Sequence, residues 1–102
     1  MGPPRLAEVL QQVTECCADY PYRIDVYVFG SAAHSSKSHP SDIDILVVYQ
    51  RNDLNSAHEL CNHLRNLITY PPLDVLALSE DEEAETDFIG NVEAKKIWPP
   101  EQ

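Results

Sequence analysis

Apolar residues recur at helical spacing in two segments of the chain. In residues 6–17 the repeat indicates an amphipathic helix of about four turns, which Pro21 would end. In residues 54–68 a similar stripe follows Asn52 and Asp53, either of which can cap a helix. The apolar positions are Leu6, Val9, Leu10, Val13 and Cys17 in the first segment, and Leu54, Ala57, Cys61, Leu64 and Ile68 in the second.

Three other apolar segments have the length of strands. They cover residues 22–29, 41–49 and 71–78. A short helix is expected at Ala32 and Ala33, with its free N–H groups directed back toward Gly30. Ser79 and Glu82 have the spacing of a capping box, and the acidic run over residues 80–87 is typical of a solvated helix start.

The order of these elements is helix, strand, short helix, strand, helix, strand and helix. It predicts an α/β (α+β) fold in which helices cover a small mixed β-sheet. A final apolar tail is expected to pack back on the sheet, and it comprises Phe88, Ile89, Val92, Ile97 and Trp98. At 102 residues the chain is expected to form one domain, residues 1–102, with ligands bound outside the strand ends.

Charge and cysteine content narrow the classes of function. A formal net charge of −10 argues against direct nucleic-acid binding, because phosphate backbones attract clusters of Lys and Arg. The same charge suits a basic protein partner, and so small a domain is compatible with homo- or hetero-oligomers. Three cysteines without a secretory signal or a long apolar span predict reduced thiols, a cytoplasmic location and no membrane contact. His58 and Cys61 are interpreted as a surface His beside a core Cys.

The candidate chemistry lies near the ends of the predicted strands. Asp42 and Asp44 are two residues apart in one strand and therefore point to the same face, while Asp74 lies in another strand. Three converging carboxylates can hold Mg²⁺, and they repel one another without a cation or a proton. Gly30 allows a phosphate to approach the backbone closely, and Ser31 adds a hydroxyl donor. This combination favours nucleotidyl transfer to a hydroxyl group.

Each feature also has a simpler interpretation. A Gly-Ser turn after a strand is common, and an Asp-x-Asp pair can bind a structural ion. Asp74 can be an acid paired with Arg23 or Arg65. The conjunction of the three features is much rarer than any one of them, so we prefer the functional interpretation.

The motifs resemble a known signature. Phe29-Gly30-Ser31 is followed, after ten residues, by Asp42-Ile43-Asp44-Ile45-Leu46-Val47, and a third acid follows in Leu73-Asp74-Val75. This pattern resembles the nucleotidyltransferase superfamily related to DNA polymerase beta. The small size of the chain places it with the minimal nucleotidyltransferase (MNT) domains of that superfamily.

The resemblance implies specific cofactors, site residues and partners. Asp42, Asp44 and Asp74 would be catalytic ligands of two Mg²⁺ ions, with Mn²⁺ as an alternative, and Gly30 and Ser31 would bind phosphate. The substrate would be ATP or another nucleoside triphosphate. The partner would be a HEPN-domain protein, because MNT proteins commonly work with one. In such pairs the HEPN member is typically an RNase toxin, and the MNT member is an antitoxin that can block it by transferring AMP to a tyrosine.

The chain departs from the family pattern directly after the Gly-Ser turn. The family often continues with Arg or Tyr, Ala, a basic residue and Gly, whereas this chain has Ala32, Ala33, His34 and Ser35. Lys37 is a candidate substitute for the missing basic contact. Three functions therefore stay open: a transferase acting on a partner hydroxyl, an antitoxin acting by contact alone, and a transferase acting on a small molecule.

Overall fold

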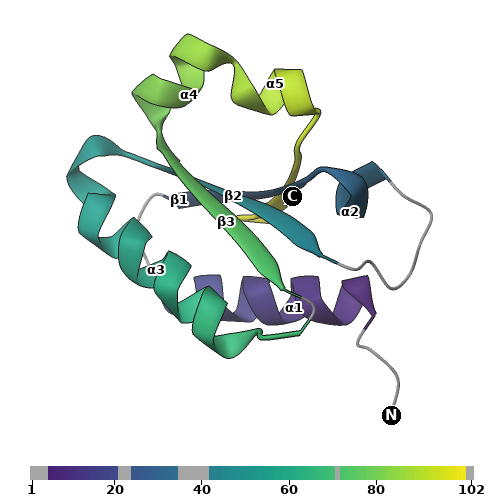
Figure 1. Cartoon of the computed structure of the whole chain (residues 1–102). Helices are drawn as coiled ribbons and strands as arrows, with labels where there is room; N and C mark the ends of the chain where they lie inside the picture. The colour runs from purple at the N-terminus through teal and green to yellow at the C-terminus, as the bar shows by residue number, and fades with distance from the viewer. Residues whose placement is uncertain (1–4, 21–23, 35–41, 71, 101–102) are drawn as a thin grey trace.

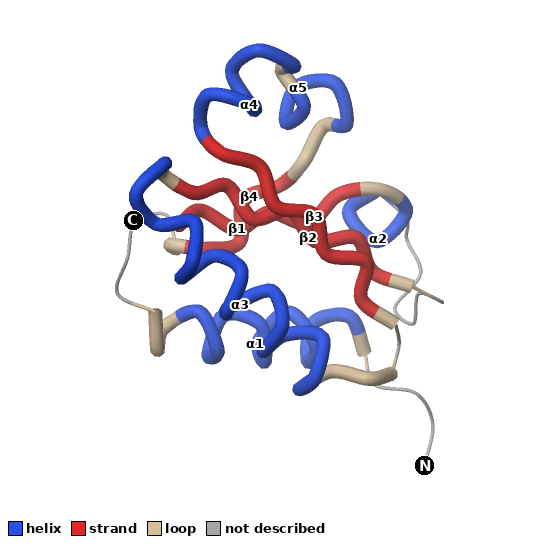
Figure 2. The backbone as a smooth tube through the Cα atoms, turned by 60° about the vertical axis from the view of Figure 1, so that its left-hand side comes forward, coloured by secondary structure: helices blue, strands red, loops and turns tan. Residues whose placement is uncertain are grey.

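A computed structural model gives the arrangement of the chain and describes residues 5–20, 24–34, 42–70 and 72–100. One β-sheet lies at its centre, with helices above and below it (Figure 1). Figure 2 shows α1 (Leu6–Cys17) and α3 (Leu54–Leu67) on one face of the sheet, and α4 (Glu80–Thr86) and α5 (Phe88–Val92) on the other. The predicted α/β fold with helices covering one sheet is confirmed.

The sheet has four strands in the order β3-β2-β1-β4. Their bounds are Ile24–Phe29 for β1, Ile43–Tyr49 for β2, Leu73–Ser79 for β3 and Lys95–Trp98 for β4. β1 pairs antiparallel with β2 and β4, whereas β2 pairs parallel with β3, so the sheet is mixed, as predicted. A parallel pair needs a crossover connection, and α3 provides it between β2 and β3.

The main core lies between the sheet and the two long helices. In β1 the buried side chains are Ile24, Val26 and Val28, because alternate strand residues face the helices. β2 is buried at every position except Asp44, because it lies inside the sheet with cover on both faces. The helical residues that complete this core are Val9, Val13, Cys16, Cys17, Ala57, Leu60, Cys61 and Leu64.

The three cysteines belong to this core. All are free thiols, as predicted, and burial raises the pKa of Cys17 to about 12. Cys61 is buried while His58 is exposed, which confirms their interpretation as a core Cys beside a surface His. In the described part of the chain, no helix combines the length and the apolar character needed to cross a membrane.

The second face of the sheet is covered by α4 and α5 over only part of its length. Leu46 and Val48 point to this face and are buried, and α4 packs on β2 and β3. Asp44 and Asp74, which lie nearer the opposite end of their strands, are half-buried and exposed, respectively. The two short helices therefore leave one end of this face accessible.

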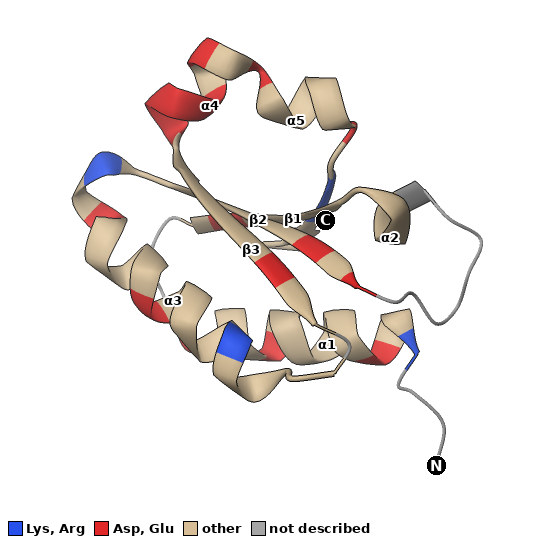
Figure 3. Cartoon of the chain, viewed as in Figure 1, with Lys and Arg blue, Asp and Glu red and all other residues tan. Residues whose placement is uncertain are grey.

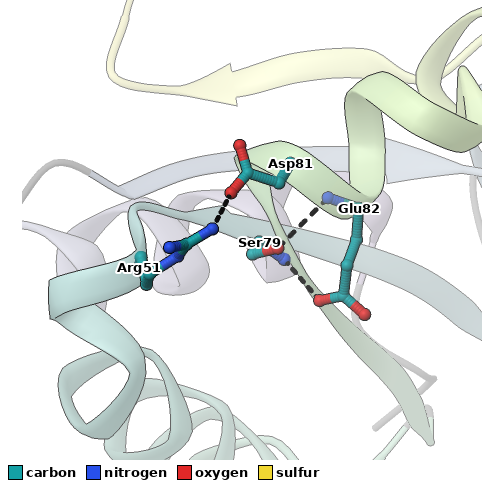
Figure 4. Close-up of polar contacts among 4 residues, drawn as sticks. All are labelled: Arg51, Ser79, Asp81 and Glu82. Atoms are coloured by element: carbon teal, nitrogen blue, oxygen red, sulfur yellow. Dashed lines mark hydrogen bonds and ion pairs between the residues drawn. The ribbon is translucent and has the colours of Figure 1, made fainter.

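The predicted capping box begins α4 (Figure 4). The Ser79 hydroxyl accepts a hydrogen bond from the Glu82 N–H at 3.1 Å, and the Glu82 carboxylate accepts one from the Ser79 N–H at 3.0 Å. Asp81 pairs with Arg51 at 2.7 Å, which joins α4 to the short 3-10 helix η1 (Arg51–Asp53). Two acidic residues of this helix start, Asp81 and Glu82, thus have local partners.

Some element boundaries differ from the predictions. The apolar tail does pack on the sheet, but residues 95–98 form a fourth strand that the sequence pattern did not indicate. Asp53 precedes α3 as expected, yet its side chain makes no capping hydrogen bond. Leu54 is 41% exposed and does not belong to the buried stripe of α3, whereas Leu60, which the stripe omitted, is fully buried. Pro21 and residues 22–23 of the predicted first strand lie outside the described residues.

Candidate active site

In the turn after β1, Gly30 lies directly beside the side chain of Asp44. Gly30 has a φ of 72°, in the left-handed region that favours glycine. Its carbonyl accepts a hydrogen bond from the Ala33 N–H at 3.1 Å, within α2 (Ser31–His34), which starts directly after the turn. A Cβ added to Gly30 would collide with Oδ2 of Asp44 on β2. The absent side chain therefore makes room for a carboxylate, a steric role that sequence analysis missed.

Two of the predicted carboxylates are direct neighbours in the sheet. Asp44 pairs with Asp74 across β2 and β3. Both side chains lie on the face away from the main core, because their neighbours Ile43 and Val75 point into it. Asp42 directly precedes β2, and its charge acts on Asp44. Figure 3 shows acidic segments side by side on β2 and β3 at this end of the sheet.

Ionisation of Asp44 is disfavoured at this site. The pKa of Asp44 is raised above its ordinary value, first by burial and then by the charges of Asp42 and Asp74. Asp42 and Asp74 are exposed, so their oxygens are accessible from solvent. Negative charge concentrated at a partly buried position favours binding of a cation or a proton there.

Arg65 does not neutralise this group of acids. It was one of the two candidate partners of Asp74, but its guanidinium donates to the Val75 carbonyl at 2.9 Å and to the Asn62 side chain at 3.3 Å. The other candidate, Arg23, lies outside the described residues, as does Lys37. Among the residues described, the acids at the sheet end therefore keep their mutual repulsion.

Aromatic side chains border the site on the β1 side. Phe29 pairs with Asp44 in the sheet, and its ring meets the Phe88 ring of α5 edge-on, with centroids 5.2 Å apart. Ser31, the first residue of α2, is exposed next to this pair. Sequence analysis did not place Phe88 here, and its only cue was the apolar tail that begins with that residue.

The donor chemistry of the site fits a divalent cation. Carboxylate oxygens are the ligands that Mg²⁺ prefers, and a cation would relieve the repulsion that contributes to the raised pKa of Asp44. Within the described residues, no three His, Cys, Asp or Glu side chains are grouped in a way that could hold a metal ion. The structure thus supplies suitable donors close together, but not a preassembled ligand set.

A comparison with protein-family models matches residues 11–97 to the family described as polymerase beta, nucleotidyltransferase. The comparison with curated proteins finds no match. The family match spans Gly30, Ser31 and all three aspartates of the site. Domains of this family generally use nucleoside triphosphates and divalent metals. Because the match covers most of the sequence, the chain belongs to the polymerase beta nucleotidyltransferase family and is a nucleotidyltransferase with a nucleotide substrate.

Proposed function

We propose that the protein transfers AMP from ATP to a hydroxyl of a partner protein, in a reaction that depends on Mg²⁺. The observation that carries the proposal is the in-register pair Asp44 and Asp74, set beside Gly30 in a chain of this family. The partial exposure of the pair supports access by a substrate. In this proposal Asp42, Asp44 and Asp74 form one catalytic group.

The site residues have two roles in this proposal, metal binding and phosphate binding. Asp42 and Asp44 hold Mg²⁺ together with Asp74. Gly30 and Ser31 bind the β- and γ-phosphates through the turn and the hydroxyl group. When bound, Mg²⁺ supplies positive charge that favours ionisation of the acceptor hydroxyl and neutralises the leaving pyrophosphate.

The proposed step is an in-line displacement at the α-phosphorus. The acceptor oxygen forms a bond to this phosphorus, the bond to the oxygen bridging to the β-phosphate breaks, and pyrophosphate leaves. Asp74 accepts the proton of the acceptor hydroxyl, because it is exposed on β3, whereas Asp44 lies on β2 and Asp42 directly before it.

The acceptor that we propose is a tyrosine of a HEPN-type toxin, which makes this protein an antitoxin. The support comes from the resemblance to MNT domains and from the net charge of −10, which speeds the encounter with a basic, RNA-binding protein. The charge also disfavours binding of RNA itself.

The test is a transfer assay with labelled ATP, Mg²⁺ and the protein encoded next to this one. We expect label and the added mass of AMP on a partner tyrosine, and loss of both in Asp42→Asn, Asp44→Asn and Asp74→Asn. Asp25→Asn is the matched control, because Asp25 lies on the same sheet face but pairs with Val48, away from the site. Equal transfer by the wild type and the three site variants would contradict the proposal.

A second candidate function is neutralisation by contact without transfer. The observation that favours it is the Ala32-Ala33-His34 sequence after Ser31, in which the basic residue common in the family is absent. In the same assay this function gives a stable complex and full neutralisation with no added AMP, and the three Asp→Asn variants stay fully neutralising.

A further inference from the structure

One edge of the sheet has unpaired backbone groups. β3 is the terminal strand in the order β3-β2-β1-β4, so among the described residues no strand pairs with its outer side. The Ile43 N–H donates to the Pro72 carbonyl at 3.1 Å, which shows that the groups of residue 72 point toward β2. Because directions alternate along a strand, Leu73, Val75 and Ala77 point their N–H and C=O groups to the outer side.

The contact of Arg65 agrees with this direction. Its Nη2 reaches the outward carbonyl of Val75 at 2.9 Å, so a side chain of α3 already uses one acceptor of the edge. A further strand would form backbone hydrogen bonds with the N–H and C=O groups of Leu73 and Ala77. An exposed edge of this kind is a template for pairing with another extended segment.

A cavity runs beside the same edge. It has a volume of about 360 Å³ and lies between α3 and β3, lined by His58, Cys61, Asn62, Arg65 and Ala77. Ala77 has an outward backbone and a side chain that faces this cavity. A strand paired with β3 would direct alternate side chains to the two faces of the sheet, and those on the α3 side would enter the cavity.

Two of the elements beside this edge, and the connection between them, have exposed apolar side chains. Among the described residues, the exposed large apolar side chains belong to α3, to the connection after it, or to β3, and they are Leu54, Leu67, Tyr70 and Leu76. Leu76 is 38% exposed and follows Asp74 by two residues, so it lies on the same face as the carboxylates. Leu76 is therefore an exposed apolar side chain on a free edge strand, where an added strand would pack against it.

A strand added to this edge would place one of its side chains next to Asp74 of the active site. The backbone of Asp74 points toward β2, so Asp74 is a non-hydrogen-bonded position with respect to an added strand. In an antiparallel pair the residue opposite such a position has its Cα about 4.5 Å away, with both side chains on the same face. A hydroxyl-bearing side chain at that position would therefore lie next to the Asp74 carboxylate.

We propose that the acceptor protein binds as an extra strand on the outer edge of β3, with its acceptor tyrosine opposite Asp74. This inference rests on the proposed function and adds how the acceptor is recognised. Backbone pairing supplies affinity, and the α3–β3 cavity selects the residue next to the tyrosine. The bound segment is basic, because β3 runs from Asp74 to the acids Glu80, Asp81, Glu82 and Glu83 in the first turn of α4.

A second copy of the chain is a poorer occupant of this edge. Two copies would each bring a formal charge of −10 to the interface, with Asp74 and the acids of α4 at the edge of both. Like charges facing one another across a strand pair are destabilising. A basic segment instead has charge complementary to the acids at both ends of β3, Asp74 at one end and the first turn of α4 at the other.

Amide hydrogen exchange of the wild-type protein tests the proposed pairing directly. The probe is a synthetic peptide with a central tyrosine, valines on either side of it and lysines at both ends. We expect slower exchange at the outward amides of Leu73, Val75 and Ala77 when the peptide binds, with little change at Leu76, whose amide already faces β2. A control peptide with the same charges and prolines in place of the valines cannot pair and should leave exchange unchanged.

Two variants test the same edge by affinity. Leu76→Lys places a positive charge beside the bound basic segment, and we expect it to weaken peptide binding at least about tenfold, or 1.4 kcal/mol. Leu54→Lys is the matched control, because Leu54 is similarly exposed but lies at the start of α3 and not on β3. Ala77→Pro removes one outward N–H without breaking the pairing with β2 and should also weaken binding.

The outcomes separate this inference from the proposed function. Edge protection by the peptide without transfer of AMP supports strand addition and counts against the transfer reaction. Transfer to the peptide with no edge protection, and with normal activity of Leu76→Lys, overturns strand addition and leaves the reaction standing. Protection of the edge amides from exchange that rises with protein concentration, without peptide, means that a second copy occupies the edge, and this overturns the proposal. A lack of peptide binding overturns it as well.

Discussion

At the scale of single residues, Gly30 and Asp44 depend on each other for their positions. Gly30 adopts a backbone conformation that disfavours other residues, and the space left by its missing side chain is taken by the Asp44 carboxylate. Phosphate binding by Gly30 remains a proposal, while this steric contact is a feature of the structure. The orientation of Asp44 is therefore sensitive to the smallest change at position 30.

Gly30→Ala should reduce transfer far more than it reduces stability. The added Cβ displaces the Asp44 carboxylate, and the positive φ adds a backbone cost of about 1–2 kcal/mol. Transfer assays and thermal melting would measure the two effects. Gly90→Ala is the matched control, because its Cβ would crowd the carboxylate of Asp87, which lies outside the site. Normal transfer by Gly30→Ala would contradict the positional role of this contact.

Asp44→Asn should abolish transfer without destabilising the metal-free protein. The folded-state pKa of Asp44 is raised above its ordinary value of 3.8, so its contribution to stability is present below that value and is lost as pH rises through the folded pKa. A neutral Asn avoids this loss. Above the folded pKa, and without Mg²⁺, the variant should melt at the same temperature as the wild type or higher.

Thermal melting between about pH 3.5 and pH 8 would check this expectation, because the interval begins below the ordinary carboxyl pKa. The melting-temperature difference between variant and wild type should grow with pH and then level off. A variant that is clearly less stable than the wild type at neutral pH would mean that the Asp44 carboxylate makes a stabilising contact in the fold.

At the scale of elements, patterns local in sequence predicted more than patterns that depend on distant partners. The capping box of Ser79 and Glu82 was predictable because both residues lie in one helical turn. Strand alternation alone predicted that Asp42 and Asp44 share a face; β2 begins at Ile43, directly after Asp42. The pairing of Asp44 with Asp74 was only an expectation, because register depends on which strands are neighbours.

The fourth strand, β4, could not be predicted from the sequence pattern. Residues 95–98 comprise two lysines followed by Ile97 and Trp98, which gives no alternation of apolar and polar positions. β4 exists because β1 has a free side, and its pairing includes an irregularity between Val26 and Tyr27. Lys96 then pairs with Asp25 at 3.6 Å, a contact between residues 71 positions apart, 96 − 25, that no local pattern indicates.

Two substitutions at the start of α4 compare how much a helix cap and an exposed ion pair contribute to stability. Ser79→Ala removes a side-chain cap and should cost about 1 kcal/mol, or roughly 4–8 °C in melting temperature for a domain of this size. Arg51→Ala removes an ion pair whose side chains are 85% and 71% exposed, so its effect should be much smaller. Thermal melting would compare them, and a larger loss in Arg51→Ala would show that the link to η1, not the cap, stabilises α4.

At the scale of the whole molecule, acidic residues lie at both ends of β3: Asp74 beside Asp44 at one end, and the first turn of α4 at the other (Figure 3). α4 packs on the strand that contains the buried Leu46 and Val48, whereas Asp42 and Asp74 are exposed. On this face of the sheet, one half is covered by helix and the other half, with the aspartates, is accessible to solvent; we call the second the open half. The open half has the uncompensated charge, and a ligand that binds there should stabilise the fold.

Mg²⁺ together with a non-hydrolysable ATP analogue should therefore raise the melting temperature. A ligand bound only by the native state and present at about 100 times its Kd stabilises by about 2.7 kcal/mol, which is many degrees for a chain of this length. The shift should disappear in Asp74→Asn and persist in Asp25→Asn, whose carboxylate lies on the same face but pairs with Lys96. Equal shifts in these two variants would place the bound nucleotide away from the aspartates. No shift at millimolar Mg²⁺ and nucleotide would count against a metal and nucleotide site at this end of the sheet.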